Sequence, residues 1–122
     1  MSKLTEHFDL EEFTVSQTAT RLGIDNTPPE LAVDNLQALC EQVLEPLRAA
    51  LGPVVISSGY RCPELNKAIG SGPNSQHTKG QAADIGVKRR TLAEVFNWLQ
   101  AHTPYDQIIR EFPPGGWVHV SH

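Results

Sequence analysis

The sequence predicts an α+β fold in which helices pack on a small, mostly antiparallel sheet. A helical apolar pattern covers residues 29–51, short runs rich in β-branched residues follow it, and residues 107–121 contain two strand patterns joined by a turn. The chain has 122 residues, of which 39% are hydrophobic and 20% charged, so it can bury a core without disulfides or partners. We therefore expect a single domain over residues 1–122, with residues 1–28 as an N-terminal wrap and residues 29–122 as the core.

Charge and hydropathy exclude several classes of function. The formal net charge of −4 argues against a nucleic-acid-binding protein, because neutralising phosphates requires a basic surface. No apolar run approaches the roughly 20 residues that span a bilayer, so we expect no membrane insertion. Residues 1–7 lack the hydrophobic core of a signal peptide, which predicts synthesis in the cytoplasm without a signal. Cys40 and Cys62 are not spaced as a disulfide framework, and we expect two free thiols.

The first half of the chain is predicted to be mainly helical. A brief helix that Asp9 opens can dock through Phe8 and Phe13. Residues 29–51 form the main amphipathic helix, in which Pro46 predicts a kink. The apolar positions of this helix recur at spacings of three and four residues, and they are Leu36, Leu39, Cys40, Val43, Leu44 and Leu47.

Short strands and helices follow. We expect a buried strand at residues 54–56, a short helix at residues 62–69 and a flexible loop at residues 70–74. Residues 82–87 form a strand, and residues 91–101 form a helix that covers the sheet.

Two strands carry polar side chains opposite an apolar face. In the strand at residues 82–87, Asp84 points away from the core face. The strands at residues 107–111 and 117–121 form an antiparallel hairpin joined by residues 112–116, in which His119 points away from its apolar neighbours. The candidate ligands of the chain therefore lie on strands or at their entrances.

His77, Asp84 and His119 can form a metal site. Two imidazoles and a carboxylate make up the ligand set of a catalytic zinc site, in which the fourth position stays open for water. Strands and their entrances are rigid enough to hold such ligands, and Gly80 and the neighbouring alanines keep bulk away between His77 and Asp84. Each residue alone also fits an ordinary role, as a loop histidine, an exposed strand carboxylate or a half-buried sheet residue.

Three blocks of the sequence carry a resemblance to a known family. They are Ser58–Arg61, Ser75-x-His77-x-x-Gly80-x-Ala82-x-Asp84 and Trp117–Ser121, and the likeness extends through residues 16–26 to nearly the whole chain. In order and approximate spacing they resemble the zinc D-Ala-D-Ala carboxypeptidase family, especially its short phage and prophage murein peptidases. The resemblance implies that His77, Asp84 and His119 bind one zinc ion, and that Arg61 holds the substrate carbonyl or the oxyanion. The fold it implies is shared with the signalling domain of hedgehog proteins.

The general base departs from the family pattern. Many relatives, including the vancomycin-resistance D-Ala-D-Ala dipeptidases, place an acidic residue three positions before the last histidine ligand, where this chain has Gly116. Our first candidate is Glu111, which the hairpin can bring back across from His119 and which similar short members have in an Ile-x-Glu strand. Asp106 is the second candidate. Glu111 could instead be an exposed hairpin carboxylate, and Asp106 a turn or cap residue.

The function that this resemblance implies is a zinc metallopeptidase. Its substrate would be a peptidoglycan stem peptide, cut as a D-Ala-D-Ala carboxypeptidase or at an L-Ala-D-Glu-type bond, by a monomer. The alternative is a zinc-containing binding domain of the same fold without turnover. A murein enzyme would act on the cell wall after phage-type release, as an endolysin does, or as part of a virion.

Further contacts around the site can be assigned from position. Candidate substrate contacts adjoin the ligands in the sequence or share the face of His119, and they are Ser75, Gln76, Trp117 and Ser121. Arg61 could instead be a structural partner in an ion pair.

Overall fold

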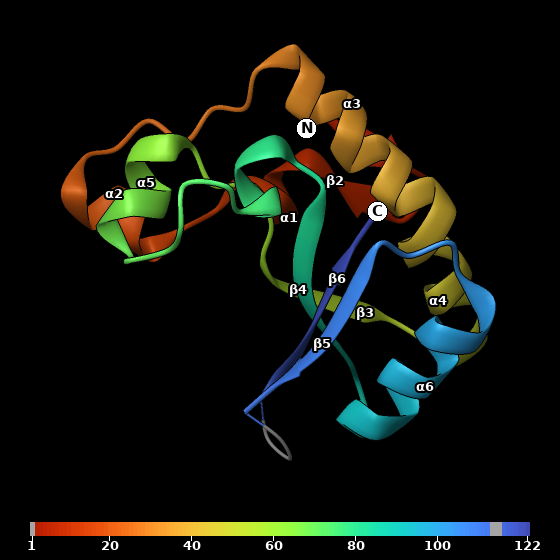
Figure 1. The fold of residues 1–122 in the computed structure, drawn as a ribbon. Helices are drawn as coiled ribbons and strands as arrows, with labels where there is room; N and C mark the ends of the chain where they lie inside the picture. Colours follow the sequence, from red (N-terminus) through yellow and green to blue (C-terminus); the bar gives the residue numbers. More distant parts are fainter. Residues whose placement is uncertain (1, 113–115) are drawn as a thin grey trace.

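The computed structural model describes residues 2–112 and 116–122. Its main sheet has four strands in the order β3-β4-β6-β5, and every neighbouring pair is antiparallel (Figure 1). The strands are β3 (Val54–Ser58), β4 (Ala82–Val87), β5 (Gln107–Glu111) and β6 (Trp117–Ser121). The predicted α+β class and the hairpin strands are confirmed. Residues 113–115 of the predicted turn lie outside the described residues.

The register of the strands places the polar positions in one row. Asp84 of β4 lies opposite His119 of β6, which in turn lies opposite Ile109 of β5. Because successive side chains of a strand point to opposite faces, these three residues share one face of the sheet. The other face belongs to the core, where the buried side chains are Ala83, Ile85, Val87, Val118 and Val120. The predicted division of the two faces is confirmed.

The core face of the sheet is covered by helices. One continuous helical segment comprises α3 (Glu30–Leu39), the π-helical turn η1 (Cys40–Leu44) and α4 (Glu45–Leu51), and α6 (Leu92–His102) packs beside it (Figure 1). All six apolar positions predicted for the main helix are fully buried.

The predicted kink at Pro46 takes the form of the π-helical turn η1. Pro46 has no N–H to donate to the carbonyl four residues back, so one backbone hydrogen bond of the helix is missing and the local helical geometry must change. The change lies one residue before the proline, where the Glu45 N–H donates to the Cys40 carbonyl five residues back and so forms a π-helical hydrogen bond. The helix therefore continues through the proline.

The N-terminal segment is more ordered than the sequence pattern predicts. The expected short helix is α1 (Leu10–Thr14), whose flanking Phe8 and Phe13 are buried. Elements that the pattern did not predict are the strands β1 (Lys3–Thr5) and β2 (Phe8–Asp9), which form a separate hairpin, and α2 (Gln17–Leu22).

Two short helical elements complete the fold. They are α5 (Pro63–Ala68), where a short helix was predicted, and the 3₁₀ turn η2 (Gln76–Lys79), which precedes β4. Cys40 and Cys62 are buried free thiols, as predicted. In the described residues no helix combines the length and the apolar character needed to cross a membrane.

Candidate metal centre

His77 is held by the turn η2. The Ser75 hydroxyl accepts a hydrogen bond from the His77 N–H at 3.2 Å, and the turn ends at Gly80, whose φ of 73° is in the left-handed region. A Cβ added to Gly80 would overlap the Ala32 carbonyl oxygen of α3. Gly80 therefore lets the turn lie against α3, which is a different role from the clearance for metal that the sequence suggested.

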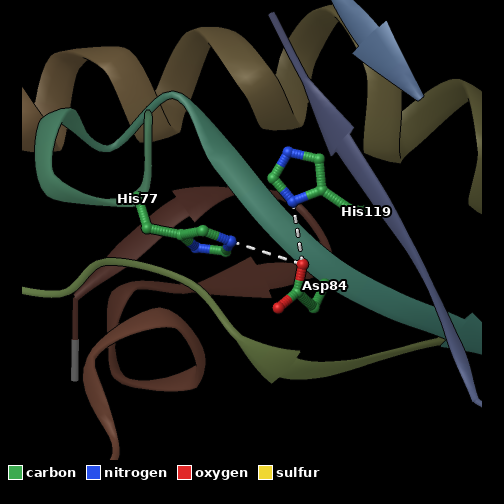
Figure 2. A group of neighbouring side chains, drawn as sticks. All are labelled: His77, Asp84 and His119. Atoms are coloured by element: carbon green, nitrogen blue, oxygen red, sulfur yellow. Dashed lines mark hydrogen bonds and ion pairs between the residues drawn. The ribbon is translucent and has the colours of Figure 1, made fainter. Parts of the chain in front are cut away.

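Three side chains from η2, β4 and β6 converge on the open face of the sheet. His77 Nε2 lies 3.3 Å from Asp84 Oδ1, and His119 Nδ1 lies 3.0 Å from the same oxygen. One ligand atom from each residue lies within 4.8 Å of the other two. Figure 2 shows a nitrogen of each ring directed at the same oxygen of the Asp84 carboxylate. The predicted grouping of the three residues is thus present in the structure.

The donor set and its spacing suit zinc. Two ligands that each lie about 2.1 Å from one ion at a tetrahedral angle are about 3.4 Å apart. The separations of 3.3 Å and 3.0 Å are close to that value. His77 is 3% exposed, and its Nδ1 lies 2.6 Å from the Gly59 carbonyl oxygen, which orients Nε2 toward Asp84. A carbonyl that fixes the second ring nitrogen is the usual support for a metal-binding histidine.

The charges at the site favour metal binding. Burial acts to raise the pKa of Asp84, but hydrogen bonds with His119 and His77 outweigh it and lower the pKa to about 2. The carboxylate is therefore ionised at neutral pH, as a metal ligand must be. Burial lowers the pKa of Arg61, and the nearby Asp84 carboxylate acts in the opposite direction.

Arg61 lies beside the three converging side chains. Its backbone N–H donates to the His77 carbonyl at 3.0 Å, and its half-buried guanidinium makes a long contact of 3.5 Å with the Ser75 hydroxyl. Among the described residues no carboxylate forms an ion pair with Arg61. The structural ion-pair alternative therefore has no partner in this part of the chain.

The other candidate contacts differ in their exposure. The Gln76 amide donates a hydrogen bond to Asp106 Oδ2 at 2.7 Å. The carboxylate of Asp106, the second candidate base, therefore links η2 to the segment that precedes β5. Trp117 is half-buried, and its ring packs against Phe112 with centroids 5.4 Å apart. Ser121 is completely buried, which leaves it no surface to offer a substrate.

Glu111 lies on the same face of the sheet as His119. It pairs with Trp117, two residues along the strand from the pair formed by Ile109 and His119. Diagonal neighbours of this kind are roughly 7–8 Å apart, a distance that a long side chain can bridge. Within the described residues no hydrogen bond or ion pair engages the Glu111 carboxylate.

The absence of an acid at position 116 has a steric reason. A Cβ added to Gly116 would overlap the carbonyl oxygen of Glu111. The hairpin therefore cannot hold an acidic side chain there without a shift of its backbone, whereas Glu111 lies on the strand face of His119.

One functional group is missed by sequence reasoning, namely the Gly59 carbonyl that orients His77. Every residue type carries a carbonyl, so no residue pattern marks this role. What Gly59 does signal is close packing, because an added Cβ would lie 2.7 Å from Phe13.

A family model described as Peptidase M15 matches residues 6–121, a range that includes η2, β4 and β6. Among curated proteins no sequence matches the chain significantly.

Proposed function

The chain belongs to the peptidase M15 family, and from this premise we propose that it is a zinc metallopeptidase that cleaves the stem peptides of peptidoglycan. The family consists of peptidases, and zinc dependence is a property of the family. The observation that carries the proposal is the convergence of His77, Asp84 and His119, whose ligand atoms lie within 4.8 Å of one another. The likeness of the sequence motifs to short murein peptidases supports the choice of substrate, which puts the site of action in the cell wall.

The proposed roles follow from the positions of the side chains. Zinc held by His77 Nε2, Asp84 Oδ1 and His119 Nδ1 would supply a water of lowered pKa and a positive charge for the substrate carbonyl. Glu111 takes a proton from the attacking water and passes it to the nitrogen of the leaving amine. The Arg61 guanidinium donates hydrogen bonds to the carbonyl oxygen as negative charge develops there.

The proposed substrate contacts are side chains that adjoin the site and are not fully buried. Ser75 and Gln76 border His77, and Trp117 borders Glu111, so these three side chains are proposed to contact the peptide. Ser121 is fully buried and is proposed to support the sheet beneath His119.

A second candidate function is a zinc-containing binding domain without turnover. Gly116 favours it, because the position at which many relatives carry their acid has no side chain here. This candidate predicts bound zinc and bound peptide, with no product.

Release of peptides from murein by the wild type separates the two candidates, and the Glu111→Gln variant tests the general base. If Glu111 is the general base, the variant keeps its zinc and loses about 10²- to 10⁴-fold in kcat on purified murein. Metal analysis and chromatography of released peptides measure the two properties. Asp106→Asn is the matched control and should stay within a few-fold of wild type. A Glu111→Gln variant that cleaves as fast as wild type would remove Glu111 from this role.

A further inference from the structure

The segment of residues 59–62 has no helix or strand of its own to fix its backbone. It joins β3 to α5, and it carries two groups of the candidate metal centre. The Gly59 carbonyl lies 2.6 Å from His77 Nδ1, and the Arg61 guanidinium is the proposed partner of the substrate carbonyl. Hydrogen bonds with other parts of the chain must therefore hold this segment in place.

Side-chain contacts do little to hold the Arg61 guanidinium. Its Nε is buried and, among the described residues, has no hydrogen-bond partner. A terminal nitrogen makes a long contact of 3.5 Å with the Ser75 hydroxyl. The direction of the side chain therefore depends on the backbone conformation of Arg61.

Asn26 binds the peptide groups on both sides of Arg61. Its Nδ2 donates a hydrogen bond to the Tyr60 carbonyl at 3.1 Å, and its Oδ1 accepts one from the Cys62 N–H at 2.7 Å. The Tyr60 carbonyl belongs to the planar peptide group before Arg61, and the Cys62 N–H belongs to the one after it. One side chain therefore restrains both φ and ψ of Arg61.

The side chain of Asn26 is itself fixed in position. The same Nδ2 donates to the Thr14 carbonyl at the end of α1 at 2.9 Å. Asp25 Oδ1 accepts hydrogen bonds from the Thr27 N–H at 3.0 Å and from the Thr27 hydroxyl at 2.6 Å, which closes a turn around Asn26. A fixed turn therefore presents the Asn26 amide to residues 60–62.

We propose that Asn26 is a positioning residue for the peptidase reaction, which fixes the backbone of Arg61 so that the guanidinium points at the substrate carbonyl. The proposal rests on the proposed peptidase function. A donor stabilises a developing negative charge only within narrow limits of distance and direction, so a small rotation of the Arg61 backbone should slow the reaction. Asn26 thereby gives the N-terminal wrap a role in catalysis.

The Asn26→Ala variant tests this role, with Asn35→Ala as the matched control. Both asparagines are half-buried, and both donate to the backbone of a distant segment, since Asn35 Nδ2 donates to the Lys79 carbonyl at 2.8 Å. With a soluble stem peptide, Asn26→Ala should lower kcat by about 10- to 100-fold and leave KM within about twofold of wild type. A wild-type kcat of Asn26→Ala would overturn the proposal.

The zinc content of Asn26→Ala separates the proposed role from an effect on His77. Gly59, whose carbonyl contacts His77, directly follows β3, and the Tyr60 N–H donates to the Phe13 carbonyl at 2.7 Å. These restraints remain in the variant, so its zinc content should match wild type. Loss of zinc would reject the proposal, because Asn26 would then act on the metal centre itself.

A double-mutant cycle shows whether Asn26 acts through Arg61. If it does, adding Asn26→Ala to Arg61→Ala should change kcat by less than about twofold, because the group that Asn26 positions is gone. Any loss from Asn35→Ala should instead multiply with that from Arg61→Ala. Multiplying losses for Asn26 and Arg61 would contradict the proposal, since Asn26 would then only support the fold. If Asn26→Ala does not fold, Asn26→Asp takes its place in the cycle, because it keeps the acceptor for the Cys62 N–H and loses the two donors.

The side-chain NMR signal of Arg61 separates this proposal from the proposed function. In the zinc-loaded protein, the order parameter of the Arg61 Nε–H should fall in Asn26→Ala and keep its value in Asn35→Ala. If the order parameter falls while the wild-type protein cleaves no peptide, Asn26 positions Arg61 and the peptidase function fails. If peptides are cleaved and the order parameter does not change, Asn26 does not position Arg61 and the peptidase function stands.

Discussion

Gly80 and Gly23 both adopt a left-handed backbone conformation, with φ of 73° and 68°, but only Gly80 touches another segment. An added Cβ at Gly80 would overlap the Ala32 carbonyl oxygen, whereas at Gly23 it would meet open space. Alanine at either position costs roughly 1–2 kcal/mol through its backbone. Gly80→Ala should cost about 1–3 kcal/mol more than Gly23→Ala because of the overlap with α3. Urea unfolding of the two variants measures the difference, and equal losses would contradict the packing of η2 on α3.

At the residue scale, the chemistry of the site could be predicted better than its supports. His77, Asp84 and His119 carry distinctive ligand groups, and strand alternation placed Asp84 and His119 on the faces opposite the apolar side chains of their strands. The Gly59 carbonyl has no such mark, because its role depends on where the backbone of a distant segment passes. The burial of Ser121 could not be predicted from the sequence either, because strand alternation gives the face of a residue and not what covers that face.

The N-terminal hairpin of β1 and β2 is fastened to the main helical segment by one carboxylate. Glu45 accepts a hydrogen bond from the His7 N–H at 2.8 Å and contacts His7 Nδ1 at 2.7 Å. Glu45→Gln should lower the free energy of unfolding at pH 7 by about 1 kcal/mol, because a charged acceptor is replaced by a neutral one. Urea unfolding measures this, and Glu41→Gln, an exposed acid of η1, is the control that should change little.

The contact between Glu45 and His7 also makes the free energy of unfolding depend on pH. Burial acts to raise the pKa of Glu45, but its contacts with Thr5 and His7 outweigh burial and lower the pKa below the ordinary value of 4.5. A lowered pKa in the folded state gives stability that is present above pH 4.5 and is lost as the pH falls through the folded-state value. The difference between wild type and Glu45→Gln should therefore shrink between pH 7 and pH 3. A difference that grows toward pH 3 would contradict this contact.

At the element scale, long periodic elements were predictable and short ones were not. The apolar spacing of residues 29–51 and the alternation of residues 82–87 predicted their elements well, because each pattern repeats over several turns or residues. The strands β1 and β2 have three and two residues, too few for a pattern, and they depend on tertiary contacts. The π-helical turn η1 follows from the missing N–H of Pro46, but a kink would have satisfied the same constraint.

Nearly all the buried hydrophobic residues in the described part of the chain belong to a cluster that runs from Leu4 to Val120. It joins the N-terminal wrap to the sheet through Phe8 and Phe13. We therefore propose that the chain is a single domain and expect one cooperative unfolding transition. Far-UV circular dichroism and the fluorescence of Trp98 and Trp117 should give the same midpoint in urea. An earlier transition in one probe would mean that the N-terminal segment unfolds separately.

At the scale of the whole molecule, the site exists because three distant segments meet on one sheet face. The hairpin and the faces of Asp84 and His119 could be expected from the sequence, whereas the pairing of β4 with β6 that brings the two residues together comes from the structure. The approach of His77 comes from the structure as well, because it depends on how η2 packs on α3 and against Gly59. The metal centre therefore depends on the tertiary fold as much as on its ligands.

We propose that His77, Asp84 and His119 together bind one zinc ion. Metal analysis of the purified protein and of three single variants, His77→Ala, Asp84→Ala and His119→Ala, tests it most directly. His102→Ala is the control, because His102 is exposed and its Nδ1 contacts the Trp98 carbonyl at 2.9 Å, away from the three ligands. We predict one zinc per chain in wild type and in His102→Ala, and an affinity weakened more than about 100-fold in each of the three variants. Unchanged zinc content in any of the three would contradict the assignment.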